Sequence, residues 1–116
     1  MSVPKIFASE YRFLLILWRH EPINSTELTR LCRQELGWSR TTTYTVIKRL
    51  SERGAVKNEN ATVTSLVSKE EIQLSEMDEM MERTFEGSLP AFVAAFARRQ
   101  KLSAEETEAL RRLIEK

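Results

Sequence analysis

The sequence predicts a mainly α-helical fold that is interrupted once by a small β-hairpin. Six segments carry apolar residues at helical spacings. Between residues 55 and 68, Val and Thr dominate and partly alternate with polar residues, which favours strands. A Ser or Asn stands next to the start of each helical segment, where its side chain can cap free backbone N–H groups.

The first helix is expected to follow Ser9, in the segment EYRFLLILWRH, whose first nine residues include seven apolar ones. Pro22 stops this helix, because proline cannot continue it. Asn24 then caps a second helix, and Glu27 stands at the capping-box spacing from Asn24. The second helix ends at Gly37, and its apolar face consists of Leu28, Leu31, Cys32 and Leu36.

A third helix is expected over residues 39–53, with Ser39 as its cap, Trp38 packed at the junction before it and Gly54 as its C-terminal cap. Its buried stripe, at the spacing i, i+3, i+4, i+7, is Thr43, Val46, Ile47 and Leu50. Its outward face is Arg40, Thr41, Thr42, Thr45, Lys48, Arg49 and Glu52, with Tyr44 at the border. Threonine is a mediocre helix former because its branched Cβ loses rotamer freedom, so four threonines in one helix need a reason.

The hairpin is expected from the strands AVKNE and ATVTSLVS, with a turn around Asn60. Ser68 and Glu71 form a capping box that opens a long acidic helix with the apolar stripe Ile72, Met77, Met80, Met81 and Phe85. Ser88 and Pro90 begin the helix LPAFVAAFARRQ, which has Leu89, Phe92, Val93 and Phe96 on one side. Ser103 and Glu106 form a last capping box before the stripe Leu110, Leu113 and Ile114.

Three helices followed by a hairpin is the element order of a winged helix-turn-helix, in which the third helix enters the DNA major groove. We therefore expect a winged-helix DNA-binding domain over residues 1–67, followed by a separate helical region over residues 68–116. Short Thr side chains let the third helix approach the groove floor, and their methyl groups can contact thymine. Arg40 is the best candidate for a bidentate guanine contact, and Arg53 adds charge near the DNA backbone. The predicted DNA-binding residues are Arg40, Thr41, Thr42, Tyr44, Thr45, Lys48, Arg49 and Lys57.

The charge distribution agrees with a nucleic-acid partner for the first half of the chain. Residues 1–60 carry ten Lys and Arg against six Glu, a net +4, whereas residues 61–116 carry eight Lys and Arg against eleven Asp and Glu, a net −3. No apolar run approaches the ~20 residues of a membrane span, so no membrane insertion is expected. The single Cys32 excludes an internal disulfide, which favours a reducing cytoplasm. No metal or cofactor is predicted.

Several segments resemble the penicillinase-repressor (BlaI/MecI-type) family of winged-helix transcriptional regulators, and together they cover nearly the whole chain. WSRTTTYTVIKRLSERGAV is the most specific, because it resembles the family's recognition helix and the start of its wing. SEYRFLLILW resembles the family's first helix, and SLVSKEE the stretch that leads into its dimerisation region. LPAFVAAFARRQKLSAEETEALRRLIEK resembles its C-terminal end.

The resemblance implies a cytoplasmic homodimer that represses transcription by occupying a pseudo-palindromic operator. In resistance-type members, a protease made active by a β-lactam-sensing membrane receptor cuts the C-terminal region. The aligned bond here is Ala95–Phe96, where known members have Asn in place of Ala95. The copper-sensing branch uses a C-terminal cluster of cysteines that this chain lacks. The resemblance also implies that residues 68–116 form a helical dimerisation region. The implied dimerisation residues are Ile72, Met77, Met80, Met81, Phe85, Phe92, Phe96, Leu110 and Leu113.

The wing departs from the family pattern. The family usually has several more residues between the two wing strands and a basic tip, whereas KNENATVTS carries only Lys57 as a positive charge. We expect fewer phosphate contacts from each subunit, so that avidity of the dimer matters more.

Two other classes of function compete with DNA binding. A protein-interaction winged helix that no longer binds DNA specifically is favoured slightly by the short wing and the net charge of +1. Such a module tends to show large apolar residues on the third helix, and this face is Thr, Arg and Lys instead. An enzyme is not expected, because His20 is the sole histidine and no nucleophile–base set, phosphate loop or metal-ligand cluster is visible.

Overall fold

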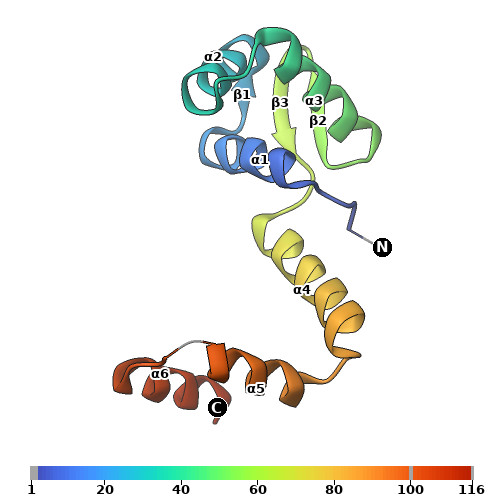
Figure 1. Ribbon diagram of the computed structural model, residues 1–116. Helices are drawn as coiled ribbons and strands as arrows, with labels where there is room; N and C mark the ends of the chain where they lie inside the picture. The colour runs from blue at the N-terminus through green and yellow to red at the C-terminus, as the bar shows by residue number, and fades with distance from the viewer. Residues whose placement is uncertain (1–2, 100, 116) are drawn as a thin grey trace. The chain divides into compact units, whose positions relative to one another are not determined.

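The computed structural model describes residues 3–99 and 101–115. Along the chain lie α1 (Ala8–His20), β1 (Ile23–Asn24), α2 (Ser25–Leu36), α3 (Arg40–Glu52), β2 (Val56–Glu59), β3 (Thr62–Ser65), α4 (Lys69–Phe85), α5 (Leu89–Arg99) and α6 (Ala104–Ile114) (Figure 1). Gln100, which the sequence places at the end of the helix that begins at Leu89, lies outside the described residues. The mainly helical fold with one hairpin is confirmed.

The chain divides into two compact units, Met1–Ser75 and Glu76–Lys116, which we call the N-terminal unit and the helical unit. This division falls inside α4, so the first turns of α4 belong to the N-terminal unit. The predicted functional boundary, between residues 67 and 68, stays a prediction. Within the described residues, no helix is both long and apolar enough to cross a membrane.

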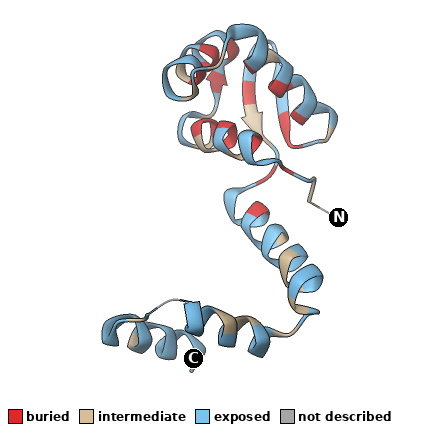
Figure 2. Cartoon of the chain, in the orientation of Figure 1, coloured by how far each residue is buried: buried red, intermediate tan, exposed pale blue. Residues whose placement is uncertain are grey.

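The N-terminal unit holds a single apolar core between α1, α2, α3 and the sheet (Figure 2). Its central side chains are fully buried, and each such Leu or Phe stabilises the fold by about 1.5–3 kcal/mol. The largest of them are Phe13, Leu14, Ile16, Leu17, Leu28, Leu50 and Ile72. Ile72 comes from the start of α4, which ties that helix to the core.

The sheet has three strands in the order β1-β3-β2, and both pairings are antiparallel. The predicted hairpin is confirmed, with Val56 opposite Ser65 and the turn at Asn60 and Ala61. Both turn residues have positive φ, 51° and 63°, the left-handed conformation that a two-residue hairpin turn of type I′ requires. Strand β1, which pairs Ile23 with Val63, was not predicted.

Most of the predicted helix caps are present. The side chains of Asn24 and Ser39 accept hydrogen bonds from the backbone N–H groups of Thr26 and Thr42. The capping boxes Ser68–Glu71 and Ser103–Glu106 both form in the two directions. The predicted box at Asn24 is wrong in one detail, because the carboxylate of Glu27 pairs with Arg30 and not with the cap.

The predicted cap of the first helix is wrong. α1 begins at Ala8, so Ser9 lies inside the helix, and Phe7 occupies the cap position. The carboxylate of Glu10 accepts the hydrogen bond of the Phe7 N–H group at 2.9 Å, which satisfies the start of the helix without a polar cap side chain.

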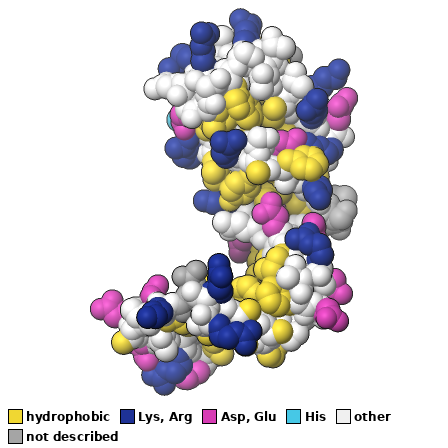
Figure 3. Space-filling model, viewed as in Figure 1, with side chains coloured by type: hydrophobic (Ala, Val, Ile, Leu, Met, Phe, Trp, Pro, Cys, Tyr) yellow, Lys and Arg dark blue, Asp and Glu magenta, His cyan; other side chains and the backbone are white. Residues whose placement is uncertain are grey.

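In the helical unit, α5 and α6 have no buried residue. Figure 3 shows hydrophobic side chains at the surface of this unit. The rings of Phe85, Phe92 and Phe96 contact one another in sequence, with centroids 5.5 and 6.2 Å apart. Leu89, Leu113 and Ile114 are nevertheless 60%, 67% and 78% exposed. One copy of these helices therefore leaves much of its apolar surface in water.

Candidate nucleic-acid interface

The start of α3 is held by three neighbouring residues of the loop after α2. Gly37 ends α2 with φ +71°, a left-handed conformation that suits glycine. Trp38 then stacks on Phe13 of α1, with ring centroids 6.2 Å apart and planes nearly parallel. Ser39 caps α3 through its Oγ atom, which lies 3.1 Å from the N–H group of Thr42. The predicted packing of Trp38 and capping by Ser39 are confirmed.

The inner face of α3 is the predicted stripe, since Thr43, Val46, Ile47 and Leu50 are all buried. Thr43 is the one polar member, and its hydroxyl donates a hydrogen bond to the Ser39 carbonyl oxygen at 3.3 Å. This bond lets a threonine replace an apolar residue in the core without an unsatisfied donor. Arg53 occupies the C-cap position after α3, and Gly54, with φ +79°, comes next and lets the chain turn toward β2.

The outer face of α3 brings five of the predicted residues around one shallow hollow, namely Arg40, Thr41, Tyr44, Thr45 and Lys48. All of them except Tyr44, which is half-buried, are exposed. The guanidinium of Arg40 lies over the Tyr44 ring, 5.5 Å from its centroid. The Tyr44 hydroxyl donates to Ser25 Oγ at 3.2 Å, and this hydrogen bond lowers the pKa of Tyr44. Arg40 is thus supported by a ring that is itself tied to α2.

The remaining predicted residues of α3 lie apart from this hollow. Thr42 is exposed, and its Oγ1 accepts a hydrogen bond from Ser39 Oγ at 2.9 Å, so its hydroxyl takes part in the cap. Arg49 is exposed about two turns beyond Thr42 along the helix.

Arg53 was predicted from the sequence to lie near the DNA backbone, but the structure gives it a structural role. Its guanidinium forms an ion pair with Glu10 and donates to the carbonyl oxygen of Lys5. It also lies 5.5 Å from the centre of the Phe7 ring. Because the Glu10 carboxylate is buried, breaking this pair to contact a phosphate is costly.

Lys57, the only cation of the wing, is paired with a carboxylate. Lys57 Nζ lies 3.0 Å from the Glu59 carboxylate on the same strand, and both side chains are more than half exposed. The ion pair reduces the positive charge that the wing presents. Lys57 is therefore a weaker candidate for a phosphate contact than its sequence position suggests.

The candidate dimerisation residues differ in burial. Ile72 belongs to the core of the N-terminal unit and is 1% exposed, so it is closed to a second subunit. Met80, Met81, Phe85 and Phe92 are half-buried within the helical unit. Met77, Phe96, Leu110 and Leu113 are exposed. The predicted cleavage bond, Ala95–Phe96, lies inside α5, with Ala95 half-buried.

Among residues 3–99 and 101–115, no three His, Cys, Asp or Glu side chains are arranged to hold a metal ion. Cys32 is fully buried in the core, as predicted, and this burial raises the pKa of its thiol to about 11. His20 is exposed in the last turn of α1, the end of a helix at which basic side chains are favourable.

Sequence reasoning missed two residues that position α3, namely Ser25 and Glu10. Ser25 is buried and holds the Tyr44 hydroxyl. In the sequence, Ser25 is one of several polar residues at the start of α2, so nothing distinguishes it from an exposed residue. Glu10 pairs with Arg53, which lies 43 positions later in the sequence, and no local sequence pattern predicts a pair at this separation.

Comparison with known proteins agrees with these features. The chain matches the family model described as penicillinase repressor over residues 6–116. The penicillinase repressor of Bacillus licheniformis is 24% identical over 118 residues, which cover 98% of this chain and 92% of that protein. The methicillin resistance regulatory protein MecI of Staphylococcus aureus is 25% identical over 116 residues, which cover 97% and 94%.

Two solved structures have the same fold as the N-terminal unit. The DNA-binding domain of the repressor BlaI in solution is 26% identical, with a TM-score of 0.52, and the match covers 61% of this chain and 93% of that one. The monomeric form of Bacillus licheniformis BlaI in complex with the blaP half-operator is 24% identical, with a TM-score of 0.53 and coverage of 60% and 90%. The predicted winged helix-turn-helix is confirmed.

Proposed function

Because the chain belongs to the penicillinase repressor family, we propose that it is a dimeric transcriptional repressor that binds a pseudo-palindromic DNA operator. It acts in the cytoplasm, and each copy places α3 in the major groove of one half-site. The genes that it controls serve antibiotic resistance, as the names of its relatives suggest.

The observation that carries this proposal is the outer face of α3. Its exposed side chains are short hydroxyls and two long cations around one hollow, and no large apolar side chain is fully exposed there. Thr41 and Thr45 are short enough to let the helix approach base edges. Arg40, resting on Tyr44, has the fork of donors that suits O6 and N7 of guanine. Lys48 and Arg49 add charge for phosphates.

This face also bears on the rival function, a winged helix that binds another protein and not DNA. Protein-interaction surfaces are rich in exposed aromatic and aliphatic anchors. The only aromatic residue on the outer face is Tyr44, which is half-buried and hydrogen-bonded to Ser25. The chemistry of the face therefore favours DNA.

The apolar surface of the helical unit supports the dimer part of the proposal. Burying the water-exposed apolar side chains of α5 and α6 in an interface would stabilise a dimer by about 25 cal/mol per Å² of apolar surface. A second copy provides the same surface, as two-fold symmetric interfaces require. The proposed interface consists of Met77, Met80, Met81, Phe85, Phe92, Phe96, Leu110 and Leu113 and excludes Ile72, which is already buried.

Release from the operator by proteolysis at Ala95–Phe96 is the last part of the proposal. The bond lies in α5, so a cut separates Phe96 and α6 from the rest of the apolar surface. The enzyme is a protease under the control of a sensor-receptor system, as the family resemblance implies. Incubation of the chain with a candidate protease, followed by mass spectrometry of the fragments, tests this bond directly.

DNA binding is tested first by gel shift and footprinting on fragments that include the protein's own upstream region, at two salt concentrations with non-specific competitor. We expect a competitor-resistant complex that protects two half-sites one helical turn or a multiple of a turn apart. Arg40→Ala should lower operator affinity by about 1–3 kcal/mol and relax specificity at one base pair. Arg83→Ala, which removes an exposed arginine of α4, is the matched control. If no fragment is preferred even at low salt, the interaction-module function replaces the proposal.

The dimer is tested by analytical ultracentrifugation of the full chain. Leu113→Glu places a charge on the apolar face of α6 and should give monomers with poor operator affinity. Leu113 is 67% exposed, so this change does not disturb the core of a single copy. Arg112→Gln changes the net charge by the same amount on the other face of α6 and should leave the dimer intact. An unchanged sedimentation mass for Leu113→Glu would remove α6 from the interface.

A further inference from the structure

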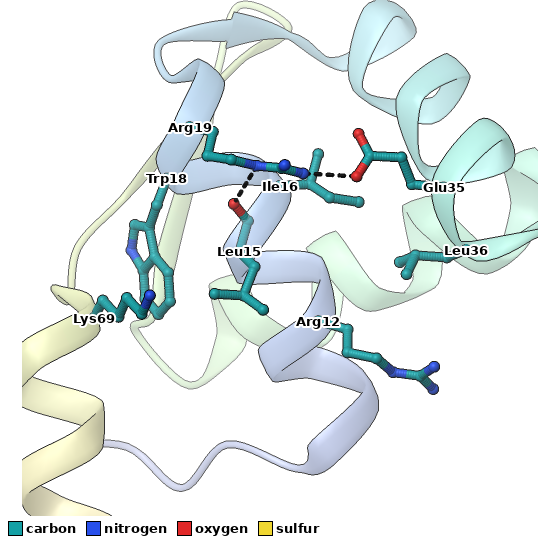
Figure 4. Close-up of a pocket in the computed structure, with 8 residues that line it drawn as sticks. All are labelled: Arg12, Leu15, Ile16, Trp18, Arg19, Glu35, Leu36 and Lys69. Carbon is teal, nitrogen blue, oxygen red and sulfur yellow. Dashed lines mark hydrogen bonds and ion pairs between the residues drawn. The ribbon is translucent and has the colours of Figure 1, made fainter.

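A second hollow lies between α1, the end of α2 and the start of α4, and it shares no residue with the outer face of α3 (Figure 4). Its volume is about 380 Å³. Binding sites for small molecules commonly enclose ~300–1,000 Å³. The hollow is therefore large enough for a compact organic molecule, and all its walls belong to the N-terminal unit.

The inner surface of this hollow is apolar. Leu15 and Ile16 contribute from α1, Leu36 from the end of α2, and Trp18 forms the side nearest α4 (Figure 4). The indole N–H group of Trp18 donates to the carbonyl oxygen of Val67 at 3.0 Å. This bond and an edge-to-face contact with Tyr11, whose ring centroid lies 5.8 Å away, fix the ring beside the hollow. The part of the ring that lines the hollow can contact an occupant. A flat apolar group is well suited to such a surface.

The rim of the hollow carries an excess of positive charge. Three cations, Arg12, Arg19 and Lys69, line it, together with one carboxylate, that of Glu35. Arg19 Nη2 lies 2.6 Å from the Glu35 carboxylate, so these two charges compensate each other. The side chains of Arg12 and Lys69 form no hydrogen bond or ion pair in the part of the chain that the structure describes. Figure 4 shows Lys69 beside Trp18 and Arg12 extending outwards from the other end of the hollow.

We propose that this hollow binds a small organic anion with a flat apolar body, of the aromatic carboxylate class. The apolar body lies against Trp18, Leu15 and Leu36, and the carboxylate pairs with Lys69 or Arg12. A helical peptide is a poorer occupant, because grooves that bind helices present apolar contacts over several turns. Here the apolar surface comprises four side chains. The proposal does not depend on DNA binding by α3.

The test is a titration of the ¹⁵N-labelled full chain with 2-naphthoate, followed by NMR. The chain has two tryptophans, so the spectrum has two indole N–H resonances, which Trp38→Phe assigns. Trp18 lines the hollow, whereas Trp38 packs against Phe13. We expect the Trp18 resonance to shift saturably and the Trp38 resonance to stay in place. The neutral amide of the same shape, 2-naphthamide, should bind at least about tenfold more weakly than 2-naphthoate.

Variants locate the anion contact. The double substitution Arg12→Gln and Lys69→Gln should weaken 2-naphthoate binding by about tenfold or more and leave 2-naphthamide binding unchanged. Arg33→Gln is the matched control, because Arg33 is an exposed arginine of α2 that does not line the hollow. Three results would each overturn the proposal, namely an unmoved Trp18 resonance at the solubility limit, equal affinity for acid and amide, or equal shifts of both indoles. Unchanged naphthoate affinity in the double variant would also overturn it.

Discussion

Replacing Arg53 with Ala removes the cation that faces the buried carboxylate of Glu10. The two side chains are 29% and 7% exposed, respectively. Without Arg53, the carboxylate keeps the hydrogen bond from the Phe7 N–H group at 2.9 Å. Loss of one partner of a fully buried ion pair costs ~3–5 kcal/mol. Because the Arg53 site is partly open to water, we expect a loss of about 2–3 kcal/mol in the free energy of unfolding.

The opposite substitution should cost less. In Glu10→Gln, the amide oxygen can still accept from the Phe7 N–H group, and Arg53 is near enough to the surface to be hydrated. We expect a loss of about 1 kcal/mol. The double variant should then be more stable than the sum of the two single losses predicts, by about 1 kcal/mol or more.

Urea unfolding of the full chain, monitored by tryptophan fluorescence, measures these differences. Both tryptophans, Trp18 and Trp38, belong to the N-terminal unit, so the signal reports on that unit. With an m-value of about 1–1.5 kcal/mol/M, Arg53→Ala should lower the midpoint by roughly 2 M. A loss within about 0.5 kcal/mol of zero, the range of an ordinary surface change, would refute the structural role of the pair.

Three other changes have defined outcomes. Glu59→Gln removes the carboxylate that pairs with Lys57. If the wing contacts DNA, binding to all duplexes should become stronger, and the slope of log affinity against log salt concentration should steepen by up to about one unit. Fluorescence anisotropy at several salt concentrations measures both. Ala61→Gly relieves a residue at φ 63° and should raise the free energy of unfolding by about 0.5–1 kcal/mol in urea titrations. Cys32, with its pKa raised to about 11, has little thiolate at pH 8, so iodoacetamide should modify it slowly until urea unfolds the chain.

Local sequence patterns were sufficient to predict most helix caps and helix ends of the N-terminal unit. The caps Asn24 and Ser39 and the end at Gly37 depend on hydrogen bonds and backbone conformations within three or four residues. The burial of Thr43 followed from helical spacing alone, and its hydroxyl is satisfied one turn earlier in the same helix. Patterns of this range can be read without knowing the fold.

The errors come from contacts between distant segments. Ser9 looks like the better cap, but Glu10 satisfies the start of α1, and its carboxylate is in turn held by Arg53 from the end of α3. Strand β1 has two residues, too few for a periodic signal, and exists because Ile23 pairs with Val63. Ile72 has the spacing of an interface residue, yet the fold buries it in the N-terminal core.

For the candidate site, the sequence predicted which side chains are exposed but not how they contact one another. Helical spacing identified which side chains of α3 face outwards. It did not give the support of Arg40 by Tyr44, the bond from Tyr44 to Ser25, or the pairing of Lys57 with Glu59. These contacts decide how much charge each segment presents, and they appear only when the elements are placed in space.

The separation of the two faces of α3 has a consequence for how this protein can diverge. Thr41, Thr45 and Lys48 are exposed and contribute little to the core, so exchanging them changes stability by no more than about 0.5 kcal/mol. The residues that hold the helix in place, Thr43, Val46, Ile47 and Leu50, point the other way. A duplicated copy of the gene can therefore acquire a new target by a few substitutions without first gaining stability to tolerate them.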